Sequence, residues 1–277
     1  MERSVARIIS ASPVIEGAGV HLNRVFGFSE VELFDPFLLL DDFRSDIPTH
    51  YLKGFPWHPH RGIETITYVL KGNVEHGDSL GNSGVISSGD VQWMTAGSGI
   101  VHQEMPKGDD RGAMHGFQLW ANLPARHKMT APRYQEITAA QIPEVSTDGA
   151  RVKVVAGEFG TTRGPVSDIF TDPEYLDVSL PEKGSFHRTL PADHTVLLYA
   201  IDGSGTTAAT TVANRQLVLY GSGDEISVSA GPEGMRFLLL SGKPLREPIA
   251  WRGPIVMNTQ EELEIAFREY QEGTFIK

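Results

Sequence analysis

Two short histidine-containing segments carry the side chains of this sequence that are best suited to chemistry. Residues 57–64 read Trp-His-Pro-His-Arg-Gly-Ile-Glu, and residues 101–105 read Val-His-Gln-Glu-Met. Residues two apart on a β-strand point to the same face, so His58 and His60 would project together, as would His102 and Glu104. Three imidazoles and one carboxylate suit a divalent ion such as Fe(II), Mn(II), Co(II), Ni(II) or Zn(II). An octahedral ion would keep two positions open for water, substrate or oxygen.

Glu64 is a further candidate at the same place. Glu64 shares strand parity with His58 and His60 and is a rival fifth ligand. It would equally suit the role of accepting the ring N–H of a ligating histidine, which is how such imidazoles are usually held.

The rest of the chain predicts many short strands that position these groups. The 277 residues include 29 glycines and 17 prolines, and turn pairs such as Gly72-Asn73 and Gly203-Ser204 interrupt short apolar runs. The length is about twice that of a typical domain. We therefore expect an all-β chain of two domains.

An internal repeat supports the two domains. The Tyr-to-Gly segments at residues 68–72 and 199–203 resemble each other, as do the Ser-Gly-Asp segments at residues 88–97 and 222–231. The proline-containing stretch between the copies predicts a boundary that gives domains 1–134 and 135–277. Near the end, Thr259 and Glu262 form a capping-box pattern, and apolar residues follow at helical spacing. One short C-terminal helix is expected there.

Composition excludes several functions. The formal net charge is -11 with 35 acidic and 24 basic residues, so direct binding to nucleic acid is not expected. The chain has no cysteine, which leaves histidine and carboxylate as metal ligands. The sequence shows no secretory segment and no apolar run long enough for a membrane helix, so we expect no membrane association and a cytoplasmic location, or a nuclear one in a eukaryote.

The motifs resemble those of the cupin superfamily, and within it the pirin family. The residues that carry the resemblance are His-Pro-His-Arg-Gly-x-Glu-Thr at 58–65, Gly-Asp-x-Gln-Trp-Met-Thr-Ala-Gly at 89–97 and Gly-Ile-x-His-x-Glu-Met-Pro at 99–106. The likeness continues through residues 35–43 and 116–124. It implies two cupin barrels, each a jelly-roll or double-stranded β-helix, packed as a bicupin.

The resemblance also implies a metal site. In pirins the ion is iron, held by the histidines of the two motifs and by the glutamate of the second. Carried over, the ligands are His58, His60, His102 and Glu104, with Glu64 not bound directly. Fe(II) is the expected ion, with Mn, Co, Ni, Cu and Zn as alternatives. Domain 135–277 lacks both motifs and is expected to be a metal-free cupin.

Two functions of different class follow from the resemblance. Bacterial pirins are similar to quercetin 2,3-dioxygenases, which open the heterocycle of a flavonol with O2 and release carbon monoxide. The metal would act as Lewis acid and Glu104 as general base. Alternatively, the protein is an iron-binding regulator that binds a protein partner according to redox state, as a transcriptional co-regulator does.

Large apolar side chains near the motifs are candidates for the walls of a pocket for a flat aromatic substrate. Those that we expect there are Trp57, Trp93, Met94, Met105, Phe117 and Trp120.

Overall fold

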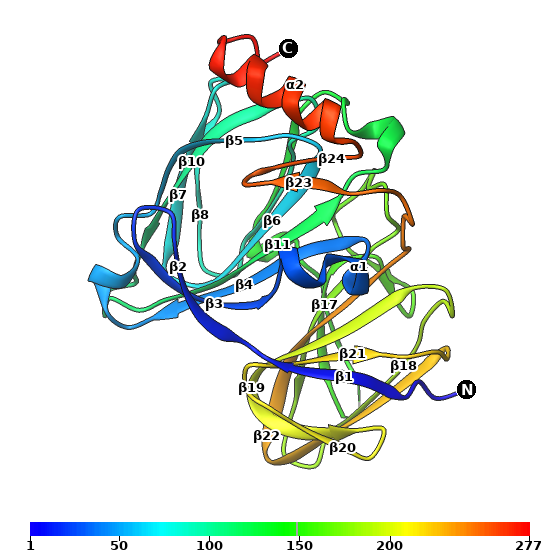
Figure 1. Ribbon diagram of the computed structural model, residues 1–277. Helices are drawn as coiled ribbons and strands as arrows, with labels where there is room; N and C mark the ends of the chain where they lie inside the picture. The colour runs from blue at the N-terminus through cyan, green and yellow to red at the C-terminus, as the bar shows by residue number, and fades with distance from the viewer. Residues whose placement is uncertain (148) are drawn as a thin grey trace. The chain divides into compact units, whose positions relative to one another are not determined.

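The computed structural model describes residues 1–147 and 149–277, most of which lie in β-strands (Figure 1). The described residues include two short α-helices, α1 (Val31–Phe34) and α2 (Gln260–Gln271), and 3-10 turns at Phe28–Glu30, Pro48–His50, Ala125–His127 and Ala139–Gln141. Within this part of the chain, no helix combines the length and apolar character that crossing a membrane requires. The all-β class with a short C-terminal helix is confirmed.

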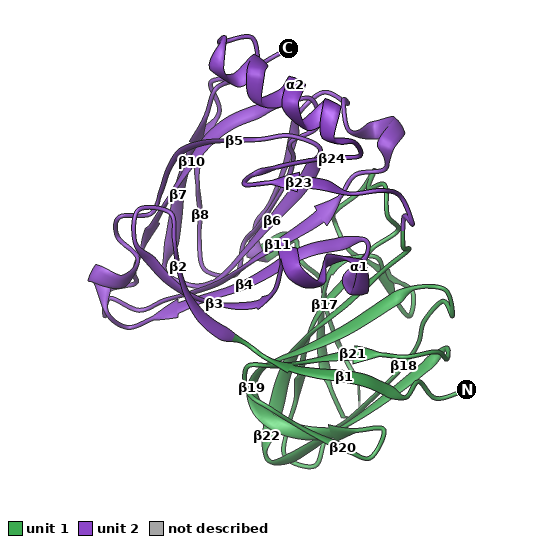
Figure 2. Ribbon diagram, viewed as in Figure 1, with its two compact units in different colours: residues 1–11, 140–244 green, residues 12–139, 245–277 purple. Residues whose placement is uncertain are grey.

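The chain forms two compact units (Figure 2). Unit 1 comprises Met1–Ala11 and Ala140–Pro244, and unit 2 comprises Ser12–Ala139 and Leu245–Lys277.

Unit 2 contains a large antiparallel sheet with the strand order β12-β9-β6-β11-β4-β3-β2. Its strands are β2 (Ser12–Glu16), β3 (Val20–Phe26), β4 (Phe37–Ser45), β6 (Ile63–Lys71), β9 (Val91–Thr95), β11 (Met114–Asn122) and β12 (Arg133–Ile137). The central strands are rich in β-branched and aromatic residues, which favour a pleated and buried surface.

A smaller antiparallel sheet of the same unit has the order β5-β10-β7-β8. Its strands are β5 (Phe55–His60), β7 (Asn73–Asp78), β8 (Ser83–Ile86) and β10 (Ile100–Lys107). Leu22 and Val69 of the large sheet share an apolar cluster with Val74 and Ile86 of the small one. The two sheets therefore pack face to face as the walls of a barrel.

The C-terminal segment of unit 2 closes over the turn between β5 and β6. It forms the hairpin β23 (Ala250–Arg252) and β24 (Ile255–Met257), followed by α2. Thr259 and Glu262 make the predicted capping box, and Leu263 and Ala266 are buried against Ile255. The predicted C-terminal helix and its cap are confirmed.

Two buried cations fasten this segment to the barrel. The Lys128 ammonium donates to the carbonyl oxygens of Gly62 and Val256, at 2.8 and 3.0 Å, and to the side chain of Asn122 at 2.7 Å. The guanidinium of Arg61, which is 2% exposed, pairs with Glu269 at 2.6 Å and donates to the backbone carbonyl of Phe275. Arg61 thus anchors the helix.

Unit 1 is a second barrel, built on a sheet with the order β1-β21-β19-β22-β17-β14-β13, with β18 paired to β22 and β20 to β19. The strands are β1 (Val5–Ser10), β13 (Glu144–Ser146), β14 (Arg151–Ala156), β17 (Glu174–Leu180), β18 (Ser185–Thr189), β19 (Thr195–Thr207), β20 (Thr210–Ala213), β21 (Gln216–Tyr220) and β22 (Glu225–Gly242). A small hairpin, β15 (Glu158–Phe159) and β16 (Thr162–Arg163), completes the unit. Its interior is a continuous cluster of buried aliphatic and aromatic residues.

The repeat seen in the sequence corresponds to equivalent strands. The path β9-β6-β11-β4 of unit 2 matches β21-β19-β22-β17 of unit 1. The repeated tyrosines, Tyr68 and Tyr199, lie on β6 and β19. β6 ends just before Gly72, with φ of 80°, and β19 contains Gly203, with φ of 66°. The two units therefore share one strand order, as the predicted pair of similar domains requires.

The division of the chain differs from the predicted domains 1–134 and 135–277. β12 pairs with β9 and so keeps residues up to 139 in unit 2. β1 pairs with β21 and places the first residues in unit 1, while residues 245–277 return to unit 2. A boundary placed by local composition cannot detect these exchanges, because strand pairing between distant segments decides them.

Candidate metal centre

The strands that carry the two histidine motifs are neighbours in the small sheet. β5 and β10 pair antiparallel with His102 opposite His58. Burial alternates along β10, with His102 and Glu104 buried and Gln103 and Met105 less so. A strand that turns one face toward the barrel interior shows this alternation of burial. His102 and Glu104 therefore share the buried face of β10.

Backbone carbonyls fix the rings of two of the histidines. His58 Nδ1 lies 2.8 Å from the Pro56 oxygen, and His60 Nδ1 lies 3.0 Å from the Pro254 oxygen. A carbonyl oxygen only accepts, so both Nδ1 atoms carry the proton, and each neutral ring presents an unprotonated Nε2.

Those two Nε2 atoms face each other at 3.0 Å. Two lone pairs at this separation repel unless a proton or a cation lies between them. Burial lowers the pKa of His58 and lowers the pKa of His60 well below its ordinary value, which disfavours the protonated form. A metal ion is the group that this arrangement fits.

His102 completes the donor set. Its ring centroid lies 4.5 Å from that of His58 and 5.0 Å from that of His60. Both its ring nitrogens are buried with no hydrogen-bond partner among residues 1–147 and 149–277. One donor nitrogen from each of the three rings lies within 4.8 Å of the others, so the three histidines are able to hold one ion.

Glu104, the fourth predicted ligand, lies next to the three histidines. Its Oε2 is 4.0 Å from His102 Nε2, and its Oε1 accepts a hydrogen bond of 3.0 Å from the Thr67 hydroxyl. Burial raises the pKa of Glu104 to about 7, and the Thr67 hydrogen bond opposes the shift.

Glu64 takes a different position from the one its spacing predicts. The chain turns at Gly62, where φ is +79°, and Glu64 belongs to β6 of the large sheet rather than to β5. Its Oε1 accepts a 2.7 Å hydrogen bond from Thr95 on β9. Burial raises the pKa of Glu64, and the Thr95 hydroxyl and the Trp93 indole oppose that rise. The period-two argument fails here because the strand does not continue through Gly62.

A cavity of about 480 Å³ lies beside His58 and His60 in unit 2. His58, His60, Glu104, Thr67 and Gln118 line one part of it. Aromatic rings form a wall that starts at the metal centre: His60 contacts Trp120 edge to face at 5.0 Å, Trp120 lies 5.8 Å from Trp251, and Trp251 lies 5.4 Å from Phe28, all between ring centroids. Most of the remaining lining is apolar.

Of the predicted wall residues, Trp120 lines this cavity, and the other five belong elsewhere. Trp57 is 53% exposed, whereas Trp93, Met94 and Phe117 are core residues that are at most 1% exposed. Met105 packs under Gly54. Phe117 precedes Gln118 and Met105 precedes Pro106, and both Gln118 and Pro106 line the cavity. Because neighbouring residues of a strand point to opposite faces, Phe117 and Met105 point away from the cavity.

Several contributors have no local signal in the sequence. Trp251 and Pro254 reach the site because the C-terminal segment returns to the barrel that residues 12–139 form. Asp41 and Arg24 lie on β4 and β3 of the large sheet. The apolar run of residues 37–43 contains two aspartates, Asp41 and Asp42, and a carboxylate that is buried there must find a partner.

In unit 1 the two histidines contact serines. His187 Nδ1 lies 3.3 Å from the Ser227 hydroxyl, and His194 Nδ1 lies 3.0 Å from the Ser241 hydroxyl. The expectation that this barrel binds no metal stays a prediction.

Two barrels of one topology, with a histidine cluster on the inner face of one of them, define a two-domain cupin protein with a candidate metal centre. The pirin family model matches residues 19–121, and the model of the pirin C-terminal cupin domain matches residues 175–276. The chain belongs to the pirin family.

Individual relatives cover nearly the whole chain. A pirin-like protein of Caulobacter vibrioides is 46% identical over 99% of both chains. A protein of Pseudomonas aeruginosa named "Putative quercetin 2,3-dioxygenase" is 44% identical over 98% of this chain and 97% of its own length. The crystal structure of quercetin 2,3-dioxygenase from Acinetobacter baumannii superposes with a TM-score of 0.92 at 33% identity, covering 99% of both chains.

Proposed function

We propose that this protein is a metal-dependent dioxygenase that cleaves flavonols such as quercetin with O2. The observation that carries the proposal is the pair of Nε2 atoms, on His58 and His60, that face each other at 3.0 Å in the lining of a cavity that also contains aromatic rings. The quercetin dioxygenase names among the relatives support the reaction class. Fe(II) is the ion that we expect.

In this proposal His58, His60, His102 and Glu104 hold the ion. The ion supplies Lewis acidity that lowers the pKa of a substrate hydroxyl. Glu104 accepts the proton of that hydroxyl as general base, and Thr67 holds the carboxylate in place through its hydrogen bond. The deprotonated flavonol then reacts with O2.

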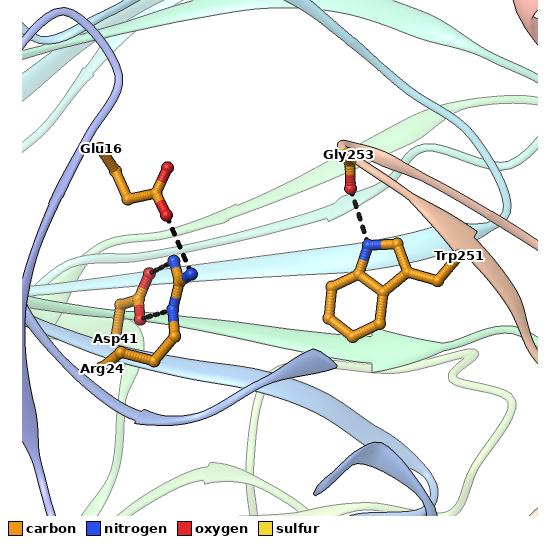
Figure 3. A network of polar contacts seen from close by, with 5 residues as sticks. All are labelled: Glu16, Arg24, Asp41, Trp251 and Gly253. Carbon is orange, nitrogen blue, oxygen red and sulfur yellow. Dashed lines mark hydrogen bonds and ion pairs between the residues drawn. The ribbon is translucent and has the colours of Figure 1, made fainter. Parts of the chain in front are cut away.

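The cavity suits a flat aromatic molecule. Its volume falls within the range of about 300–1,000 Å³ that small-molecule sites occupy. Trp120 and Trp251 offer rings for contact, and the Trp251 indole N–H is already satisfied by the Gly253 carbonyl at 2.7 Å (Figure 3). Because that N–H has a partner, the ring can pack against an apolar ligand without leaving a buried donor unpaired.

The test is flavonol consumption in air by protein reconstituted separately with Fe(II), Mn(II), Co(II), Ni(II), Cu(II) and Zn(II). The expected result is loss of the quercetin absorption band with matching uptake of O2, absent in the double variant His58→Ala/His60→Ala. Failure of every metal-loaded form to consume flavonol would overturn the proposal. A redox-dependent role toward a protein partner would then be the better explanation of a bound ion.

A further inference from the structure

A row of polar side chains crosses the large sheet along the cavity. Thr67 on β6 is paired in register with Gln118 on β11, Gln118 with Asp41 on β4, and Asp41 with Arg24 on β3. All four line the cavity. Adjacent strands are about 4.8 Å apart, so the row spans roughly 14 Å from Thr67, which contacts Glu104, to Arg24.

The far end of the row is an ion-paired group that we call the acidic triad: Glu16, Arg24 and Asp41 (Figure 3). Arg24 binds Asp41 through two hydrogen bonds of 2.9 and 2.8 Å and binds Glu16 Oε1 through a third of 2.9 Å. The Asp41 side chain is 7% exposed and that of Glu16 is 43% exposed. Figure 3 shows Trp251 across from the triad, and both line the cavity.

The charges of the triad select the kind of group that it is able to bind. Two carboxylates surround one guanidinium, so the triad carries a net charge of -1. An anionic ligand group would be repelled, whereas a neutral hydroxyl would find an acceptor, because only one of the two Glu16 oxygens is taken by Arg24. Charge-assisted hydrogen bonds of this kind are about twice as strong as neutral ones.

We propose that the acidic triad is the specificity subsite for a hydroxyl donor on the ring of the substrate that lies farthest from the metal. The inference rests on the proposed function and narrows its substrate class to planar, multi-ring phenols that carry a metal-binding oxygen at one end and a neutral hydroxyl at the other. Glu16 is the specificity-determining residue, and the aromatic wall of Trp120 and Trp251 contacts the rings between the two ends.

The test measures equilibrium binding without turnover. Zinc-loaded protein under argon is titrated with flavonols whose pendant ring bears no hydroxyl, one hydroxyl, two hydroxyls or a carboxylate. A hydrogen bond to a charged acceptor corresponds to about a tenfold change in affinity or more. We expect the hydroxylated ligands to bind about tenfold more tightly than the unsubstituted one, and the carboxylated ligand to bind most weakly.

The variant Glu16→Gln keeps the shape and the Arg24 contact but replaces the second carboxylate oxygen with a donor. It should lose the hydroxyl preference and bind the carboxylated ligand more tightly than the wild type does. A loss of packing alone would weaken all four ligands together. Glu75→Gln is the matched control, because Glu75 is an exposed strand glutamate of unit 2 that also forms an ion pair, with Lys107, and does not line the cavity.

The outcomes separate this inference from the proposed function. If the four ligands bind equally well to the wild type, or if Glu16→Gln leaves their ranking unchanged, the triad is not the subsite, although flavonol binding stands. Tightest binding of the carboxylated ligand would show an anion site and overturn the inference. If no flavonol binds to the metal-loaded protein, the proposed function fails and the inference fails with it.

Discussion

The backbone carbonyl of Pro254 lies 3.0 Å from Nδ1 of His60, although 194 positions separate the two residues in the chain. The contact fixes which nitrogen of His60 is available to a metal. It also makes the C-terminal segment part of the candidate metal centre, because such partners of a ligand ring contribute strongly to metal affinity.

Removal of residues 245–277 should therefore abolish metal binding. The truncated chain loses the Pro254 carbonyl. It also loses Glu269 and the Val256 carbonyl, which accept hydrogen bonds from the buried side chains of Arg61 and Lys128. We expect the metal content per chain, measured by mass spectrometry, to fall close to zero. Deletion of residues 1–11, which belong to unit 1, is the control and should leave the metal content unchanged. Retention of the ion by the chain that ends at Pro244 would contradict the prediction.

Single substitutions test the ligands. His58→Ala, His60→Ala and His102→Ala should each lose the ion without unfolding the chain, because the apolar clusters of both barrels remain intact. The ligand assignment is tested by measuring the metal content of each variant by mass spectrometry, and circular dichroism verifies that each variant is folded. His187→Ala in unit 1 is the control. Unchanged metal content in all three variants would show that the ligand assignment is wrong.

The two buried glutamates should behave differently. Glu104→Gln removes the proposed base and should lower kcat for flavonol cleavage by about 100-fold or more while most of the ion is retained. Glu64→Gln alters a residue that contacts Thr95 on β9, so it should keep the ion and change turnover only modestly. Complete loss of metal in Glu64→Gln would instead place Glu64 among the ligands.

Lys128 should make the stability of the protein depend on pH. Burial lowers the pKa of Lys128 to about 7, whereas an unfolded lysine titrates near 10.4. Between these values the unfolded chain binds more protons than the folded one, so the free energy of unfolding rises with pH in this window. One proton contributes at most about 1.4 kcal/mol per pH unit, which gives a rise of roughly 2 kcal/mol from pH 7 to pH 9.

Urea unfolding at pH 7 and pH 9 measures this effect. Lys128→Met should remove the rise and should also lower stability at pH 9, because the carbonyls of Gly62 and Val256 lose their donor. The same pH dependence in the variant and in the wild type would assign the rise to another group.

The sequence by itself determined the residue types of the site and the kind of fold. The two His-x-ligand pairs predicted which side chains share a face, because strand periodicity is a local property. The glycine turns and the internal repeat predicted two all-β domains, the family resemblance implied that these are cupin barrels, and the capping box at Thr259 marked the start of α2.

The tertiary structure decided the features that depend on contacts between distant segments, which local periodicity cannot predict. Gly62 ends one strand and separates Glu64 from the histidines. The pairing of β1 with β21 and the return of residues 245–277 set the unit boundaries. The row from Thr67 to Arg24 exists because four strands from different parts of the sequence align in register. Each of these features depends on which distant segments pair, and pairing is settled by the burial and hydrogen bonding of the whole barrel rather than by any one segment.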